Sequence, residues 1–527
     1  MIKKKKENLQ NNNLLQHSLS LQTSGKLNQS LGIREITKQN GITLIALVVT
    51  IVVLLILAGI TISLVFSDNG IIAKAREAAN KTNEAIINEQ TQMNELADYM
   101  GNMLNTIGGG STPEEPEKPI GGEYSDSEGV NTPQYYASQM TPIKWDSNTN
   151  DWVETTGDDP DWYDYSAKKW ANAKTSDGSM WVWIPRYAYS ITSGYHTSTT
   201  GTIEVEFMKG TSKEGSTDKS IVEYNSDTTS NYTQFPNGYV IHPAFNYGEE
   251  VSGLWVAKFE ASHTGCTTDV STGETNTDST SLTLQVKPGV TSWRNITIGN
   301  AYTVCLEYDS KTLGNANLNS HMMRNDEWGA VAYLSKSEYG KETEEVWINN
   351  SSSYITGSAG NSASAAADEG TTSDYTSTQG VEASTTGNVY GVYDMSGGAW
   401  ERVAAYVDNG NPNLTTYGNS LYTSTDAKTK NVYTAGSGDT RLANYNSNAS
   451  KYGDAVYETS SGTYNSSGDA NNQSWYGDYS YFPYSGIPFF NRGGYYSNTA
   501  FAGVFYFGGG NGSAYGDNSF RPVLVII

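Results

Sequence analysis

The sequence is poor in cysteine and histidine, the residues that most often bind metals. It has two cysteines, Cys266 and Cys305, and they form no CxxC pair, which argues against a zinc or thioredoxin-type motif. The five histidines are scattered and lack metal-ligand spacing; they are His17, His196, His242, His263 and His321. Outside the cell a Cys266–Cys305 disulfide can form, and two buried free thiols are an equal alternative.

Charged residues are scarce too, at 17% of the 527 residues. With 53 Gly, 37 Tyr and 12 Trp, this composition favours a β-rich, turn-rich protein over a helical bundle. The net charge of −23 divides into +5 for residues 1–41 and −28 for the remainder. An acidic body repels phosphate backbones, so we expect no nucleic-acid partner.

One long stretch, residues 42–67, carries no charge over 26 residues. As a helix it would be ~39 Å long, enough to cross a ~30 Å hydrocarbon core. We therefore predict a single transmembrane helix. The basic residues precede it, so residues 1–41 are expected in the cytoplasm and the C-terminal body outside the cell.

The start of this stretch, Lys38–Leu47 (KQNGITLIAL), resembles the processing site of type IV prepilins. The resemblance covers about residues 34–107. It implies that a prepilin peptidase cleaves between Gly41 and Ile42 and removes the basic leader, residues 1–41. The family usually has Glu five residues after the cut, where this chain has Ala46. Two roles for this segment therefore stay open: assembly with pilus subunits, and a simple membrane anchor.

Residues 68–107 continue as an amphipathic helix with apolar residues every seven positions, from Ile72 to Ile107. This stripe predicts a stalk that packs either on its own domain or on neighbouring helices. Residues 108–122 are rich in Gly, Pro and Glu and are expected to form a linker.

The body, residues 123–527, consists of short apolar runs separated by polar and Gly-rich segments. We expect strands at Trp181–Pro185, Gly238–Ile241 and Leu254–Phe259, and a helix at Arg324–Ser335. Residues 351–386 and 408–470 are polar and are predicted to be long surface insertions.

Several segments of the body, in the same order, resemble the formylglycine-generating enzyme family, whose fold is a variant of the C-type lectin fold. The sharpest match is Asn388–Glu401, NVYGVYDMSGGAWE. The others are Trp183–Tyr187, Ile241–Phe245, Trp255–Glu260, Asp326–Tyr333, Arg492–Gly494 and Phe520–Leu524. The resemblance spans about residues 181–527. It implies an α+β, C-type-lectin-like domain, β-rich with few helices and long loops, carried on the pilin-type N-terminal helix.

The activity of that family is not expected here. Its enzymes use cysteines near the Arg-Gly-Gly segment, where this chain has Tyr495 and Tyr496, and no cysteine follows Cys305. Asp394 and Glu401 are the remaining acid/base pair, but in a core-forming loop carboxylates usually accept backbone hydrogen bonds. We expect no catalytic residue and no cofactor. The loop at 465–472 is compatible with Ca²⁺ without being specific for it.

The C-terminal segment, Tyr476–Phe520, is dense in Tyr, Phe, Asn, Ser, Gly and Asp. Tyr offers rigid contact area, while Ser, Gly and Asn offer adaptable hydrogen bonds, which is typical of binding surfaces. About half of residues 489–519 are polar or Gly, which favours a displayed surface over a core.

This segment also resembles the variable region, here residues 487–519, of diversity-generating-retroelement proteins, which use the same lectin-type scaffold. The resemblance implies these exposed, ligand-binding positions: Phe490, Asn491, Tyr495, Tyr496, Ser497, Asn498, Phe501, Phe505, Phe507, Asn511, Ser513, Tyr515, Asp517 and Asn518. The implied fixed scaffold is Arg492, Gly493, Gly494, Ala502, Gly503, Val504, Phe520, Arg521 and Pro522. An undiversified lectin-type adhesin would have the same composition.

Together these features predict a cell-surface receptor or adhesin whose extracellular ligand is a protein, a glycan or a phage surface. A minor pilin or passive structural subunit is the first alternative, and a formylglycine-generating-type enzyme is the second.

Overall fold

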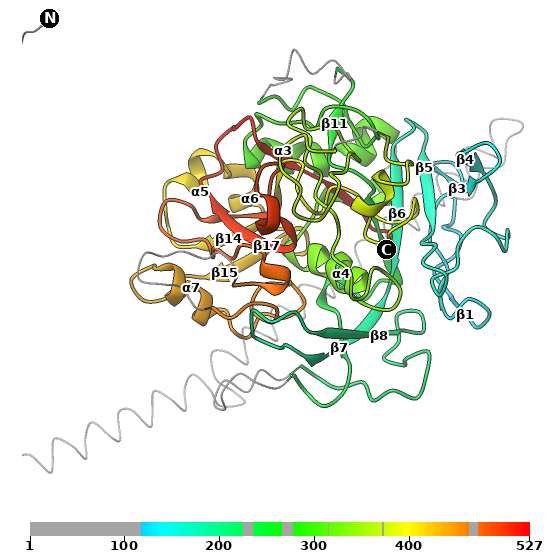
Figure 1. Ribbon diagram of the computed structural model, residues 1–527, viewed down its shortest axis with the longest axis horizontal. Helices are drawn as coiled ribbons and strands as arrows, with labels where there is room; N and C mark the ends of the chain where they lie inside the picture. The colour runs from blue at the N-terminus through cyan, green and yellow to red at the C-terminus, as the bar shows by residue number, and fades with distance from the viewer. Residues whose placement is uncertain (1–116, 225–234, 266–277, 315, 371–373, 463–472) are drawn as a thin grey trace, which may run out of the picture. The chain divides into compact units, whose positions relative to one another are not determined.

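Short strands joined by long connections make up most of the protein (Figure 1). The computed structural model describes residues 117–224, 235–265, 278–314, 316–370, 374–462 and 473–527. The predicted leader (1–41), membrane helix (42–67) and stalk (68–107) lie outside these residues, as do positions 108–116 of the linker. Within the described part, none of the helices has the length and apolar character needed to span a bilayer.

A seven-stranded antiparallel sheet holds the C-terminal strand inside it. Its central strands β6 and β10 are buried along their whole length, as expected for apolar runs covered on both faces. In spatial order its strands are β13 (Ser320–Met322), β19 (Pro522–Leu524), β10 (Gly253–Ala257), β6 (Met180–Pro185), β5 (Asn172–Thr175), β3 (Met140–Asp146) and β4 (Asp151–Glu154).

A second, five-stranded sheet is built mostly from the C-terminal third of the chain. Strand β14 lies between β16 on one side and β15 and β18 on the other, and β17 pairs with β16. Figure 1 shows this sheet at one end of the domain and β3, β4 and β5 at the other. Its strands are β14 (Trp400–Asp408), β15 (Asn431–Thr434), β16 (Phe489–Gly493), β17 (Gly503–Gly510) and β18 (Asn518–Phe520).

Smaller elements complete the described part. The remaining strands are β1 (Tyr124–Ser125), β2 (Val130–Asn131), β7 (Tyr187–Ser193), β8 (Thr202–Phe207), β9 (Val240–Ile241), β11 (Ser262–His263) and β12 (Leu284–Gln285). The α-helices are α3 (Ile298–Leu306), α4 (Asn325–Lys336), α5 (Asn413–Thr416), α6 (Asn419–Thr423) and α7 (Arg441–Ser447). The domain is thus mixed α/β, strand-rich and poor in helix, which confirms that part of the predicted fold.

Helix α4 ties the second sheet to the core. It is buried along its entire length, and its Trp328 indole Nε1 donates a hydrogen bond of 2.8 Å to the Val504 carbonyl in β17. Arg492 of β16 and Arg521 place their guanidinium groups 5.5 and 5.9 Å from the Trp328 ring centre. The sequence predicted this helix with its start and end shifted by one residue.

The interpretation of residues 408–470 as a surface insertion is wrong for part of its described positions. This segment supplies β15, which pairs in parallel with β14 over Ala405–Asp408. It also contributes buried side chains, among them Leu414, Tyr433 and Tyr445. Its Asn- and Ser-rich composition hides these apolar residues because they are spaced widely between polar turns.

Candidate ligand-binding site

The register of the second sheet sorts its side chains onto two faces. Arg402 lies opposite Asn491, and Asn491 lies opposite Gly508. Directly opposed residues of paired strands share a face, so these three form a row on one side, which we call the hollowed face. The row beside it points to the opposite face and is fully buried; it consists of Glu401, Arg492 and Phe507.

Strand β17 ends in three consecutive glycines, Gly508–Gly510. A Cβ atom at Gly510 would lie 3.0 Å from Asn491 Nδ2, and one at Gly508 would lie 2.9 Å from the Tyr506 hydroxyl. The missing side chains leave space between the larger residues around them, and two adjoining hollows result.

The first, which we call the Asn491 hollow, has a volume of about 300 Å³. It is lined by Trp400, Arg402, Ile487, Asn491, Gly509, Gly510, Asn511, Tyr515, Asp517 and Asn518. Asn518 is 5% exposed, and its side-chain oxygen has no hydrogen-bond partner among the described residues. An unpaired buried polar atom costs on the order of 1–3 kcal/mol, so this wall favours a partner that donates a hydrogen bond.

Two charged groups flank the Asn491 hollow. The buried Arg402 guanidinium donates to the carbonyls of Ile296 (2.6 Å), Gly512 (3.2 Å) and Ser513. Burial lowers the pKa of Arg402 to about 10, so it stays cationic at neutral pH. Burial also raises the pKa of Asp517 above its ordinary value, and the positive charge of Arg402 partly offsets this effect. Arg402 thereby fixes the loop that forms one rim of the hollow.

The second, the aromatic hollow, has a volume of about 380 Å³ and shares Trp400 and Gly509 with the first. Its other lining residues are Tyr479, Tyr481, Tyr495, Asn498, Phe501, Tyr506 and Gly508. No Asp, Glu, Lys, Arg or His of the described chain is among them. The rings are held against one another. Tyr495 lies 4.3 Å from Trp400, and the Tyr479 ring is nearly parallel to Tyr481 at 5.6 Å and to Tyr506 at 5.7 Å between centroids.

Most of the predicted ligand-binding residues lie at or beside these hollows. Half-buried or exposed are Tyr495, Tyr496, Ser497, Asn498, Phe501, Asn511, Ser513, Tyr515 and Asp517. Asn491 and Asn518 are buried but line the Asn491 hollow.

The expectation that Phe490, Phe505 and Phe507 face solvent is wrong, because all three are fully buried. The Phe490 ring packs on Tyr433 with 4.5 Å between ring centroids, and the Phe505 ring packs on Trp475 with 5.2 Å between centroids. Successive side chains of a strand point to opposite faces, so Phe505 and Phe507 enter the core while Tyr506 between them lines the aromatic hollow.

The predicted site residues did not include these lining residues: Trp400, Arg402, Tyr479, Tyr481, Ile487, Tyr506 and Gly508–Gly510. The alternation of Phe505, Tyr506 and Phe507 was a signal that could have identified Tyr506. Trp400 and Arg402 come from β14, and their strand partners Asn518 and Asn491 lie 118 and 89 positions later. No local pattern indicates these pairings.

The carboxylates weighed as an acid/base pair are parts of the core. Asp394 accepts hydrogen bonds from the backbone N–H groups of Gly357 (2.8 Å) and Glu260 (3.3 Å), which confirms the structural interpretation for this residue. Glu401 forms a bidentate ion pair with Arg521. Burial raises the pKa of Glu401 to about 7, against the opposing charge of Arg521.

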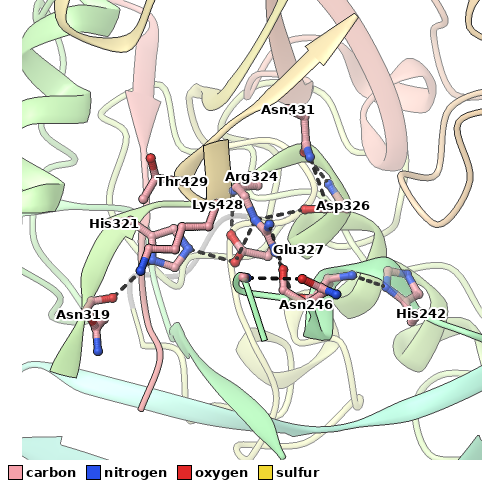
Figure 2. Close-up of polar contacts among 12 residues, drawn as sticks. His242, Asn246, Asn319, His321, Arg324, Asp326, Glu327, Lys428, Thr429 and Asn431 are labelled. Carbon is pink, nitrogen blue, oxygen red and sulfur yellow. Dashed lines mark hydrogen bonds and ion pairs between the residues drawn. The ribbon is translucent and has the colours of Figure 1, made fainter. Parts of the chain in front are cut away.

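A second buried polar cluster surrounds the start of α4 (Figure 2). His321 Nε2 lies 2.8 Å from Glu327 Oε1, and Glu327 Oε2 accepts from the Arg324 backbone N–H at 2.7 Å. Burial opposes ionisation of Glu327, yet His321 and Arg324 hold its pKa below the ordinary value. Arg324 in turn donates to the carbonyls of Ala244 and Asn246. These mutual contacts cap α4 and give the cluster a structural role.

Neither metal nor disulfide chemistry marks another site in the described part. It contains no group of three or more His, Cys, Asp or Glu residues arranged to hold a metal ion. Cys305 is a buried free thiol in α3, and Cys266 lies outside the described residues, as does the 465–472 loop. A comparison with protein-family models and one with the curated proteins both found no match to this chain.

Proposed function

We propose that this protein is a cell-surface ligand-binding receptor or adhesin that recognises its ligand with the hollowed face of the second sheet. The observation that carries the proposal is the pair of adjoining hollows, since a concave site lined by aromatic and a few polar side chains is typical of ligand recognition. Binding draws on ring burial and hydrogen bonds and needs no cofactor.

The two hollows favour different parts of a ligand, because one has polar walls and the other has aromatic walls. The unpaired Asn518 oxygen and the rim formed by Arg402 and Asp517 favour hydrogen-bonding groups in the Asn491 hollow. The rings of the aromatic hollow offer apolar area that is already ordered, so little conformational entropy is lost on binding. An extended ligand can occupy both hollows because they meet at Trp400.

We further propose that the scaffold is a C-type-lectin-like domain with a diversified surface. The half-buried and exposed positions of 495–517 surround the hollows, whereas Arg492 and Arg521 of the implied fixed scaffold are fully buried. Substitutions at the former positions would change the ligand without removing core contacts. A near-copy of the 3′ end of the gene, differing mainly at adenines beside a reverse transcriptase gene, would support diversification; its absence would reduce the claim to an adhesin.

The proposal places this domain outside the cell. The uncharged residues 42–67 would anchor it, and a prepilin peptidase would cleave between Gly41 and Ile42. The charge difference between residues 1–41 and the body supports this orientation. The same orientation makes extracellular protein, glycan or phage surface the candidate ligands.

Filling the hollow tests the binding function. The full-length protein in maltoside micelles would be screened on glycan and peptide arrays. The affinity for the ligand found there would then be compared between the wild type and Gly510→Val. The valine Cβ would press on Asn491, and strands tolerate valine, so we expect the variant to fold and lose at least about tenfold in affinity.

The control is Gly265→Val, which makes the same change at an exposed turn beside β11. It should retain the ligand. Equal binding by wild type and Gly510→Val, with both folded, would contradict the proposed site, and so would an absence of any ligand on either array.

A further inference from the structure

The lining of the aromatic hollow restricts the chemistry of the group that fits it. Six aromatic side chains enclose it: Trp400, Tyr479, Tyr481, Tyr495, Phe501 and Tyr506. None of its described lining residues is an Asp, Glu, Lys, Arg or His. Ring faces carry negative electrostatic potential and attract cations within about 6 Å of the ring centre, and several rings together form the cages that recognise quaternary ammonium groups.

Two polar groups that line the hollow already have hydrogen-bond partners within the protein. The Asn498 side-chain oxygen already accepts from the Tyr495 backbone N–H at 2.9 Å, and the hydroxyls of Tyr481 and Tyr484 lie 3.3 Å apart. A primary ammonium has three N–H donors to satisfy, and a sugar carries several hydroxyls. A quaternary ammonium has no N–H group, so entering this hollow leaves no donor unpaired.

One ring of the hollow already binds a cation within the protein. The Arg441 guanidinium carbon lies 3.4 Å from the centre of the Tyr481 ring and 5.2 Å from that of Tyr484. This contact shows that the Tyr481 ring attracts a cation, and because Arg441 already covers it, a ligand cation is left with the other rings of the hollow. The net charge of the whole chain also favours a cationic ligand, because a charge of −23 concentrates cations near the protein surface.

We infer that the aromatic hollow binds a quaternary ammonium group, such as the trimethylammonium of a choline headgroup or of trimethylated lysine. The inference rests on the proposed binding function and assigns a ligand class to one of its two hollows. The trimethylammonium sits against the rings that Arg441 leaves uncovered, Tyr495 among them, and the rest of the ligand extends past Trp400 toward the Asn491 hollow.

The test separates the effect of the ligand's positive charge from the effect of its shape. Saturation-transfer NMR follows the methyl protons of choline, and in parallel those of 3,3-dimethylbutan-1-ol, its uncharged carbon analogue, with the full-length protein in maltoside micelles. We expect choline to bind about tenfold more tightly than the alcohol, since cation–π attraction acts only on choline. Equal affinities would mean that the hollow is merely apolar and would overturn the inference.

Matched variants place the binding at this hollow. Tyr495→Leu keeps an apolar side chain but removes a ring, and should weaken choline binding about threefold while leaving the alcohol unchanged. Tyr124→Leu makes the same change at a half-buried position in β1 that lines neither hollow, and should leave both affinities unchanged. Equal loss of choline binding in both variants would contradict the assigned location.

Two further arms identify the source of the group. Phosphocholine represents a lipid or glycan headgroup, and Nε-trimethyl-lysine represents a modified protein; binding of either that depends on Tyr495 supports the inference. If an array ligand binds in a Gly510-dependent manner and no quaternary ammonium competes with it, the inference fails while the proposed function stands. If no array ligand binds at all, both fail.

Discussion

At the scale of single residues, the core carries several carboxylates that burial makes hard to ionise. Glu458 is the clearest of these. It is fully buried and accepts hydrogen bonds from the hydroxyls of Tyr189 and Tyr333 and from the Gly453 backbone N–H. Burial raises its pKa to about 8, although the Gly453 N–H and Tyr333 hydroxyl act in the opposite direction.

This raised pKa predicts a loss of stability with rising pH. Below about pH 4.5 the carboxyl is protonated in both folded and unfolded chains and contributes no pH dependence. Between about pH 4.5 and 8 only the unfolded chain ionises, so Glu458 lowers the free energy of unfolding by up to about 1.4 kcal/mol per pH unit. Above pH 8 the effect levels off.

Replacing the carboxyl isolates this contribution. Chemical unfolding of Glu458→Gln from pH 4 to 9 should give a shallower fall of stability than the wild type, so the difference between the two grows with pH up to about 8. The exposed Glu214→Gln serves as the control and should follow the wild type. A constant difference across this range would contradict the shifted pKa.

At the scale of elements, the local patterns predicted strands and helices better than they predicted faces. The strand at Trp181–Pro185 and the helix at Arg324–Ser335 were predictable because each has a continuous apolar or helical pattern. The sides of β17 were not assigned, because the abundance of Phe and Tyr in the segment says which residues can bind and not which way they point. Only the pairing of β17 with β16 assigns Phe507, and by alternation Phe505, to the buried face.

Two phenylalanines in this region give a direct comparison of core and rim. Phe505→Ala should lower the free energy of unfolding by about 3–5 kcal/mol, because it leaves a cavity beside Trp475. Phe501→Ala, four residues earlier in the half-buried η8 (Thr499–Phe501), should cost less than about 1 kcal/mol. Denaturant unfolding of the two variants measures both values; equal costs would contradict the assignment of Phe501 to the rim.

The site itself needed long-range information. Tyr495, Asn498 and Phe501 were predicted because they follow the Arg-Gly-Gly segment, to which the resemblance applied directly. Trp400 was quoted only as part of the Asn388–Glu401 match, and Arg402 had no signal at all. Their place at the hollows follows from the parallel pairing of Trp400 with Asn518 and the antiparallel pairing of Arg402 with Asn491, which no nearby sequence pattern specifies.

At the scale of the whole molecule, we propose that an N-terminal anchor displays the binding domain outside the cell. Both hollows lie on the last structural unit of the chain, β14 to β18, together with the 479–481 segment. The central claim of this proposal is that Tyr495 and Tyr515, in loops beside the second sheet, face the extracellular medium.

Tyrosine modification on intact cells tests this claim most directly. Cells expressing the full-length chain are treated with a membrane-impermeant tyrosine reagent, and the modified positions are mapped by mass spectrometry. We predict modification of Tyr515, which is 54% exposed, and to a lesser degree of Tyr495, while the buried Tyr433 stays unmodified. Modification of Tyr515 only after the cells are lysed, or of Tyr433 as readily as Tyr515, would contradict the account.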